Sequence, residues 1–332
     1  MKVGAVVIGR NEGPKLRRSL ASVLGRVDAV VFVDSGSEDD SVEVARALGV
    51  EVVELDPALP FTVARARNQG FVRLVQRDPE IDFVQFVDAD SDIVASWIER
   101  AVRLLRDEPR CALVFGHTRE RFPRKSVHTR IYSVSYHPGL ADPQVSGGMA
   151  MVRVSAFRQM GGFVSSIRGL EDRELSFRLC KAGWRIVRLD VDMAVHEAGM
   201  DSFAHWWRRR VNSGASLAHE NALHHPPLPL ARRSSLSSWF WGLAVPGGAL
   251  TAAWPTDGVS LFLLGGHLAL IARIYRRTRR AGVDRADAAL YAGACVLSKF
   301  PQALGQIRFH VERMTGKVRV ALPEPIEPYA PR

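Results

Sequence analysis

The stretch DFVQFVDADSD, residues 82–92, joins an apolar run typical of a buried β-strand to three closely spaced aspartates. The apolar part ends at Val87, and Asp88, Asp90 and Asp92 follow it. Clustered carboxylates repel one another and need a counter-charge, which solvent or a cation can supply. The pattern therefore fits either a polar turn or helix cap at the surface, or a metal site.

Strand-like and helix-like segments alternate through the N-terminal third of the chain. Apolar runs typical of strands occupy residues 3–8, 29–34, 50–55, 82–88 and 111–120, and amphipathic segments typical of helices lie between them. This alternation predicts an α/β fold with a mostly parallel, Rossmann-like sheet and helices on both faces. Ligands of such sheets bind at the carboxyl ends of the strands.

Polar residues follow the predicted strands at that edge of the sheet. Asn11 and Glu12 come after the first strand, Asp34 ends the second, and Asp88 and Asp90 close the fourth. Their common position favours a ligand or metal site over a surface turn.

The pattern changes after about residue 140. The segment QVSGGMAMVRVSAF, which includes Gly147 and Gly148, is expected to form a strand. A helix is expected to begin at Glu171 and Asp172, and a later strand is expected to end at His196.

Composition restricts the partners and the compartment. The 332 residues carry a net charge of +10, which is compatible with nucleic acid, an anionic membrane surface or a phosphate-bearing substrate. Cys111, Cys180 and Cys295 are isolated, so we expect reduced thiols in a cytosolic compartment. The apolar run at the N-terminus is too short for a signal peptide and is typical of a first strand.

The C-terminal third is apolar and flanked by arginines. An uncharged run over 234–256 is long enough to span a bilayer, and the run over 258–272 is marginal. Arginines at both ends predict a membrane hairpin, 236–272, whose ends face the cytoplasm, and amphipathic helices over 284–316 on the membrane surface. A buried helical pair in a soluble protein is the alternative. Because the arginines flank these runs and no nucleic-acid motif is present, a membrane explains the charge better than nucleic acid does.

Seven motifs, in this order, resemble the inverting family 2 glycosyltransferases of GT-A fold. They are VVIGRNEG (6–13), VDSGSEDDS (33–41), ARARNQG (64–70), FVDADSD (86–92), VSGGMAMVRVSAFRQMGGF (145–163), LEDRELSFRL (170–179) and HWWRRR (205–210). The resemblance runs from Val3 to about Gly214, and the order and spacing of the motifs are more specific than any one of them. It implies a GT-A catalytic domain over 1–230, which leaves 231–332 as a membrane-associated helical region and tail.

The resemblance identifies Asp88-Ala89-Asp90 as the family's DxD motif. It implies that Asp90 binds a divalent cation, Mg²⁺ or Mn²⁺, and that Asp88 contacts the nucleotide or the metal. Departure of a nucleoside diphosphate needs charge neutralisation, which such a cation supplies. His196 is a further candidate metal ligand, and a purely structural histidine is the alternative.

The resemblance also implies a set of contacts with the nucleotide sugar. They are Asn11, Glu12, Asp34, Arg67, Asp88, Gly147, Gly148 and Arg209. For Glu12 an interaction with a helix start is an equal alternative, and for Arg67 a solvated position on a helix. Within 208–210, at least one arginine is expected to be a membrane-surface charge.

Inversion requires in-line attack by an acceptor hydroxyl and a base to receive its proton. Asp172 matches the aspartate of the family's ED motif, which is the base, and Glu171 would orient the acceptor or the backbone. A position at a helix start favours an ionised carboxylate, and an ordinary acid in the first turn is the alternative. Leu170 stands where the family pattern often has glycine, which weakens the match of the acceptor loop but not the assignment of the base.

These expectations describe a glycosyltransferase at the cytoplasmic face of the inner or plasma membrane. It would move a sugar from a nucleotide-diphosphate sugar to a glycan or lipid-linked acceptor in polysaccharide or glycolipid biosynthesis, and no nucleic-acid partner is expected. A sugar nucleotidyltransferase is one alternative, against which the loop GRNEG argues. A non-catalytic relative that binds nucleotide sugars is another, against which the joint presence of Asp88, Asp90 and Asp172 argues.

Overall fold

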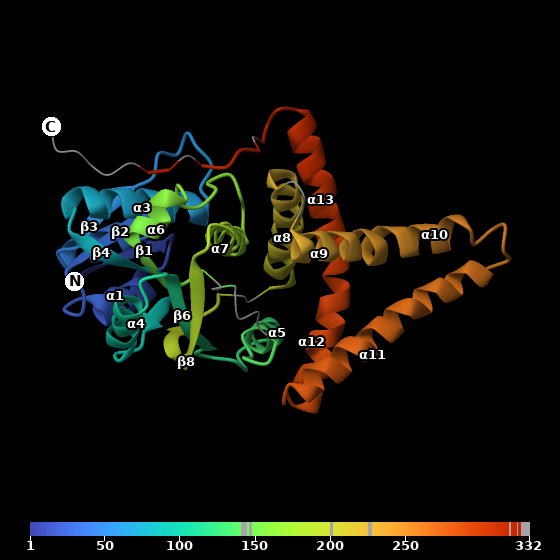
Figure 1. Cartoon of the computed structure of the whole chain (residues 1–332). Helices are drawn as coiled ribbons and strands as arrows, with labels where there is room; N and C mark the ends of the chain where they lie inside the picture. Colours follow the sequence, from blue (N-terminus) through green and yellow to red (C-terminus); the bar gives the residue numbers. More distant parts are fainter. Residues whose placement is uncertain are drawn as a thin grey trace. The chain divides into compact units, whose positions relative to one another are not determined.

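The computed structural model describes residues 1–140, 145, 148–199, 202–224, 228–318, 320–323 and 325–326. The chain forms two compact units, which Figure 1 colours along the sequence. The first unit comprises Met1–Arg121, Asp142–Ala198 and Ala321–Arg332, and the second comprises Phe122–Ala141 and Gly199–Val320. The expected boundary at residue 230 lies within the second unit, and the assignment of 231–332 to a membrane stays a prediction.

The first unit is built on an eight-stranded sheet of order β3-β2-β1-β4-β7-β6-β8-β5. The strands are β1 (Lys2–Gly9), β2 (Ala29–Asp34), β3 (Glu51–Glu54), β4 (Ile81–Asp88), β5 (Ser91–Ile93), β6 (Cys111–Glu120), β7 (Ala150–Arg153) and β8 (Arg185–His196). Neighbours among β3, β2, β1 and β4 pair in parallel, as do β6 and β8. β7 is antiparallel to β4 and β6, and β5 to β8. The predicted α/β fold with a mostly parallel sheet is confirmed.

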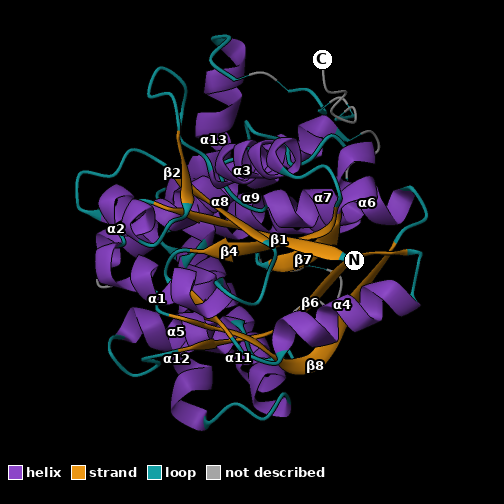
Figure 2. Ribbon diagram, turned by 90° about the vertical axis from the view of Figure 1, so that its left-hand side faces the viewer, coloured by secondary structure: helices purple, strands orange, loops and turns teal. Residues whose placement is uncertain are grey.

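Helices cover both faces of this sheet. They are α1 (Gly13–Val23), α2 (Ser41–Ala47), α3 (Val63–Arg77), α4 (Trp97–Asp107), α6 (Val154–Gln159) and α7 (Glu171–Lys181). Figure 2 shows α3 and α6 on one side of the strands and α1 and α4 on the other. β1, β2 and β4 are therefore buried along almost their whole length, as their continuous apolar sequences require.

The segment from Val145 to Phe157 differs from the single strand that the sequence predicts. β7 is short, and the chain passes directly into α6 at Val154. This turn brings the Phe157 ring to 4.5 Å from the ring of Phe71 and 5.4 Å from that of Phe86. Burial of an aromatic cluster against the sheet therefore outweighs the local preference of this segment for an extended conformation.

The second unit is helical. It contains α5 (Val127–Ser135), α8 (Phe203–Leu223), α9 (Pro229–Trp239), a π-helical turn (Phe240–Ala244), α10 (Val245–Thr251), a 3₁₀ helix (Val259–Leu264), α11 (Gly265–Arg280), α12 (Arg285–Leu297) and α13 (Lys299–Met314). α8 and α13 pack closely because glycines lie where they cross. A Cβ atom on Gly305 would lie 1.9 Å from the carbonyl oxygen of Val211, and one on Gly214 would lie 2.1 Å from that of Gln302.

The segment from α10 to α11 exposes many large apolar side chains. Trp254 is 93% exposed, Phe262 84% and Leu268 70%. By length and composition, Val259–Arg280 could cross a membrane; it is the one such helix in the described parts of the chain, and little of it is buried. The sequence favoured the preceding run, 234–256, as the longer span. A single helix of this kind is a weak indication of membrane association.

Candidate active site

The carboxyl ends of three parallel strands bring the predicted polar residues to one edge of the sheet in the first unit. Gly9 of β1 pairs with Asp34 of β2, and Ile8 pairs with Asp88 of β4. Asp34 and Asp88 thus lie on either side of the end of β1, whose next residue but one is Asn11.

The Asp34 carboxylate closes the loop that follows β2. It accepts hydrogen bonds from the backbone N–H groups of Gly36 at 2.9 Å and Ser37 at 2.8 Å, and from the Ser37 hydroxyl at 2.5 Å. The loop after β1 is joined to it, because the Asn11 N–H donates to Ser37 Oγ and Asn11 Oδ1 accepts from the Glu38 N–H. Asn11 adopts a left-handed backbone conformation (φ 58°) to make these contacts. The two loops therefore form one rigid rim.

Arg67 of α3 connects two distant parts of the site. Its guanidinium is buried, with Nη2 2.8 Å from Asp88 Oδ1 and Nη1 2.8 Å from Glu171 Oε1. Burial would lower the pKa of Arg67, but the charges of Asp88 and Glu171 raise it. Gly148 lies against this guanidinium, since a Cβ atom there would be 2.9 Å from Arg67 Nη2. Arg67 thereby holds the end of β4 beside the start of α7.

The start of α7 presents two adjacent buried carboxyl groups in different surroundings. Leu170, in a left-handed conformation (φ 66°), precedes Glu171 and Asp172. Burial raises the pKa of Glu171, the Arg67 charge opposes this rise, and the Asp172 charge adds to it. Asp172 is buried, at 8% exposed, yet within the described residues its side chain forms no hydrogen bond or ion pair. The first turn of α7 stabilises its negative charge.

Asp90 lies in the turn between β4 and β5 and faces His196 at the end of β8. β5 pairs with β8 so that Ser91 is opposite His196, which brings Asp90 Oδ2 to 3.1 Å from His196 Nε2. Glu120 Oε2 lies 3.4 Å from His196 Nδ1 on the other side of the ring. Burial alone would raise the pKa of Asp90, but the hydrogen bond and charge of His196 outweigh it and lower the pKa.

Glu12 and Lys15 lie close to Asp90. Lys15 Nζ is 3.0 Å from Glu12 Oε2, one turn away on α1. Burial raises the pKa of Glu12, and the charge of Asp90 contributes to this rise. Burial would lower the pKa of Lys15, but its interactions with Glu12 and the charge of Asp90 raise it. Glu12, which the sequence predicted, is therefore paired with Lys15, which the sequence analysis did not identify.

Gly147 and Arg209 are the two remaining predicted residues. Gly147 lies outside the described residues. Arg209 belongs to α8 of the second unit, where its Nη2 donates to the Tyr132 hydroxyl at 2.8 Å and its guanidinium lies 4.9 Å from the Tyr132 ring centre. The donor contact predicted for Arg209 stays a prediction.

Sequence reasoning missed Glu120 and Lys15. Glu120 is the last residue of β6, at the same carboxyl-end position that identified Asp34 and Asp88, so the rule that found those residues could have found it. Lys15 carries no such signal, because it lies on a helix among other basic residues.

Comparison with known proteins agrees with this arrangement. Residues 5–161 match the family model "Glycosyl transferase family 2". The pre-mycofactocin glycosyltransferase of Mycobacterium tuberculosis (strain CDC 1551 / Oshkosh) is 28% identical over 246 residues, which cover 68% of this chain and 48% of that protein. The succinoglycan biosynthesis protein ExoA of Rhizobium meliloti (strain 1021) is 27% identical over 194 residues, which cover 55% and 57%. The chain spans less than two thirds of the length of these curated relatives.

The fold has a counterpart among solved structures. The mannosyltransferase PcManGT from Pyrobaculum calidifontis, in complex with GDP-Man and Mn²⁺, superposes with a TM-score of 0.56 at 21% identity, over 90% of this chain and 86% of that one. Sheet order and this likeness show that the first unit has a GT-A fold. The match over residues 5–161 relates this part of the chain to glycosyltransferase family 2.

Proposed function

We propose that the chain transfers a sugar from a nucleotide-diphosphate sugar to an acceptor hydroxyl, with inversion at the anomeric carbon. The observation that carries this proposal is the buried Arg67, which bonds both Asp88 of the DxD turn and Glu171 beside Asp172. A transferase must hold the leaving diphosphate and the attacking hydroxyl in one fixed geometry. Arg67 meets that need, because it connects the turn that contains Asp88 to the start of α7, where the proposed base lies.

Asp90 and His196 are the proposed cation ligands, with Asp88 beside them. Their oxygen and nitrogen donors lie 3.1 Å apart, as two ligands of one ion can. No group of three or more His, Cys, Asp or Glu side chains suited to a metal ion occurs among the described residues, so the diphosphate and water would complete the coordination. Mg²⁺ is commonly bound in this way, through one or two carboxylates and substrate phosphates. When bound, the cation neutralises the charge that develops on the diphosphate.

Asp172 is the proposed base. As the acceptor oxygen attacks the anomeric carbon, its proton passes to the Asp172 carboxylate and the bond from that carbon to the diphosphate breaks. Glu171 is already engaged by Arg67, which leaves Asp172 as the carboxylate free to accept a proton. Glu171 then acts as a positioning residue.

The nucleotide part of the donor is proposed to bind at the rim formed by the loops after β1 and β2. Asn11, Glu12 and Asp34 lie there, and Gly148 lets the chain approach Arg67 closely. Gly147 and Arg209 complete the proposed donor contacts on the strength of their sequence motifs alone.

The acceptor is proposed to be lipid-linked, and the enzyme to work at the cytoplasmic face of a membrane. The exposed apolar residues of the second unit and the arginines that flank them support this part of the proposal. ExoA, one relative, is named for the biosynthesis of succinoglycan, which supports a role in polysaccharide or glycolipid assembly.

The test combines three variants of the full chain with nucleotide sugars and Mn²⁺ or Mg²⁺. Asp90→Asn should lose cation-dependent donor binding, whereas Asp172→Asn should keep donor binding and lose transfer. Asp92→Asn is the matched control from the same aspartate cluster, because Asp92 is paired with Arg121 and should be dispensable for the cation. The wild-type product should have the opposite anomeric configuration to the donor and release nucleoside diphosphate. Retention seen by NMR, or release of pyrophosphate, would overturn the proposal.

A further inference from the structure

The second unit contains a partly buried arginine that no acidic side chain neutralises. Arg210 lies on α8, and its Nε atom is buried without a hydrogen-bond partner. Within the described residues its side chain makes no hydrogen bond or ion pair, and the guanidinium lies 5.8 Å from the ring centre of Trp206. A buried N–H donor without a partner is unfavourable, and structures normally supply a hydrogen-bond acceptor to such a group. The Nη atoms of Arg210 are not among the buried atoms that lack a partner, and the residue is partly exposed, so an external anion can reach the guanidinium.

The surroundings of Arg210 increase the excess of positive charge. Burial lowers its pKa, the neighbouring charge of Arg209 lowers it further, and the groups that oppose this are Cys295, Tyr132 and Tyr291 rather than a carboxylate. Lys299, at the start of α13, is also largely buried, and only the Cys295 thiol opposes the lowering of its pKa. The side chains that act on the charges of Arg210 and Lys299 are therefore basic, phenolic or thiol groups, and no carboxylate is among them.

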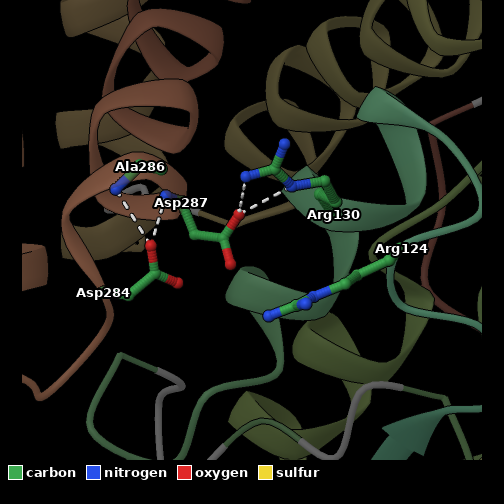
Figure 3. A pocket seen from close by; sticks show the side chains of 5 residues that line it. All are labelled: Arg124, Arg130, Asp284, Ala286 and Asp287. Atoms are coloured by element: carbon green, nitrogen blue, oxygen red, sulfur yellow. Dashed lines mark hydrogen bonds and ion pairs between the residues drawn. The ribbon is translucent and has the colours of Figure 1, made fainter.

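A nearby cavity shows the opposite arrangement. Figure 3 shows its lining residues, Arg124, Arg130, Asp284, Ala286 and Asp287, around a volume of about 430 Å³. Arg130 Nη2 lies 2.6 Å from Asp287 Oδ1, and Asp284 accepts from the first N–H groups of α12. Because its charges balance within the protein, this cavity gives no reason to expect an ionic ligand.

We propose that Arg210 binds the phosphate group of a membrane lipid. A guanidinium presents a fork of N–H donors that matches phosphate oxygens, and the aromatic ring of Trp206 flanks the guanidinium of Arg210. The exposed apolar residues of the same unit, such as Trp254 and Phe262, favour a lipid over a soluble anion as the source of the phosphate. This inference goes beyond the proposed function, because binding of the lipid requires no sugar transfer.

The experiment measures partitioning of the full chain onto vesicles of phosphatidylcholine with and without phosphatidic acid. Arg210→Gln should reduce partitioning onto the phosphatidic acid vesicles roughly tenfold or more, as expected for loss of hydrogen bonds to a charged group. Arg208→Gln removes an exposed charge from the same helix, and should cost about fivefold or less, the contribution of one surface arginine. Equal losses of partitioning in the two variants would mean that the vesicles respond only to the net surface charge of the protein, and would overturn the proposal.

Soluble anions distinguish the source of the phosphate. Inorganic phosphate should leave the melting temperature of the detergent-solubilised wild type unchanged. If phosphate raises the melting temperature of the wild type but not of Arg210→Gln, the site binds free phosphate, and the proposal of a lipid ligand is wrong. If Arg210→Gln instead loses affinity for a nucleoside diphosphate with Mn²⁺, the anion is the diphosphate of the donor, which also overturns the proposal. Because donor binding is measured separately, failure of the proposed transferase function would be seen independently.

A last arm tests whether Arg210 is merely structural. Without any anion, Arg210→Gln should melt at the same temperature as the wild type or higher, because it removes a partly buried charge whose Nε has no hydrogen-bond partner. A lower melting temperature in anion-free buffer would show that the arginine supports the fold by itself, and the proposed site would be withdrawn.

Discussion

In the first unit the buried guanidinium of Arg67 lies between the carboxylates of Asp88 and Glu171, whereas in the second unit the partly buried Arg210 forms no hydrogen bond or ion pair among the described residues. Both arginines lie on helices and both are surrounded by aromatic rings, Phe163 for Arg67 and Trp206 for Arg210. The difference lies in the charge that surrounds them, since one is neutralised within the protein and the other is not.

This contrast distinguishes a structural role of an arginine from a ligand-binding role. Arg67 has both ends of its guanidinium occupied, so it fixes the relative positions of the groups that it joins. Arg210 has its donors available, so an external anion can satisfy them. The first arrangement predicts that replacement damages the fold, and the second predicts that replacement damages binding alone.

The largest effect is expected from Arg67→Met. Removing Arg67 leaves the buried carboxylate of Glu171 without compensation, which costs about 3–5 kcal/mol of stability. Hydrogen exchange of peptides from β1 and β4 should report this loss, because it resolves the first unit from the second. Arg103→Met is the control, since Arg103 forms an exposed pair with Glu99 and its loss should cost about 0.3–0.5 kcal/mol. Similar losses in both variants would contradict the bridging role of Arg67.

The stability of the second unit should depend on the close approach of the α8 and α13 backbones rather than on charge. Gly305→Ala would place a methyl group 1.9 Å from the Val211 carbonyl oxygen, so α8 and α13 must separate, at a cost of about 1–3 kcal/mol. Gly293→Ala lies on α12 with nothing within 4 Å of the new methyl group, so the gain in helix propensity should stabilise the unit by up to about 1 kcal/mol. Faster hydrogen exchange in α8 and α13 for the first variant, and not for the second, is the expected result.

Much of the sheet could be predicted from the sequence because its strands are buried on both faces. The runs 29–34 and 111–120 correspond to β2 and β6 residue for residue. β2 is buried throughout and β6 over its first six residues, as apolar runs covered by helices on each side require. β5 could not be predicted in this way. It has three residues, two of them polar, and exists because it pairs with β8, which is distant in sequence.

The site shows the same division. Carboxylates that end parallel strands meet at one edge by topology, so the neighbourhood of Asp34 and Asp88 could be predicted from strand positions alone. The bond between Arg67 and Glu171 spans 104 residues and depends on how α3 and α7 pack, so no local pattern reveals it. The sequence analysis assigned Arg67 to the nucleotide, or to solvent on a helix face. The structure buries it, which excludes the solvated alternative.

A smaller effect is expected at Gly148, which tests how tightly the bridge is enclosed. Gly148 has φ +100°, and a methyl group there would lie 2.9 Å from Arg67 Nη2, so Gly148→Ala should cost about 1–2 kcal/mol through backbone strain and displacement of the guanidinium. Gly25→Ala has a comparable positive φ of +74° with nothing within 4 Å, so it measures the backbone strain alone. Donor binding should weaken in Gly148→Ala and stay unchanged in Gly25→Ala.

The smallest effect concerns the pH dependence of stability. It tests whether burial of Glu171 outweighs the charge of Arg67 in setting the pKa of Glu171. Its pKa in the folded chain is raised above the ordinary value of 4.5, mainly by burial, so the folded state holds a proton that the unfolded state has released in the interval between the two pKa values. Glu171 therefore contributes stability that is complete below the unfolded pKa and is lost as the pH rises through the folded pKa. The slope cannot exceed one proton, about 1.4 kcal/mol per pH unit.

Glu171→Gln should lack this slope, so above pH 4.5 the stability of the wild type should fall with rising pH relative to that of the variant. The absolute stability of the variant also changes through the lost pair with Arg67, so the comparison is made between slopes. Melting temperatures taken across the weakly acidic range provide the measurement, with Glu99→Gln as the exposed control. A wild type whose stability rises with pH relative to Glu171→Gln in this range would mean that the Arg67 charge outweighs burial. In that case the bridge would stabilise the ionised carboxylate, and the contrast with Arg210 would be larger than the pKa of Glu171 suggests.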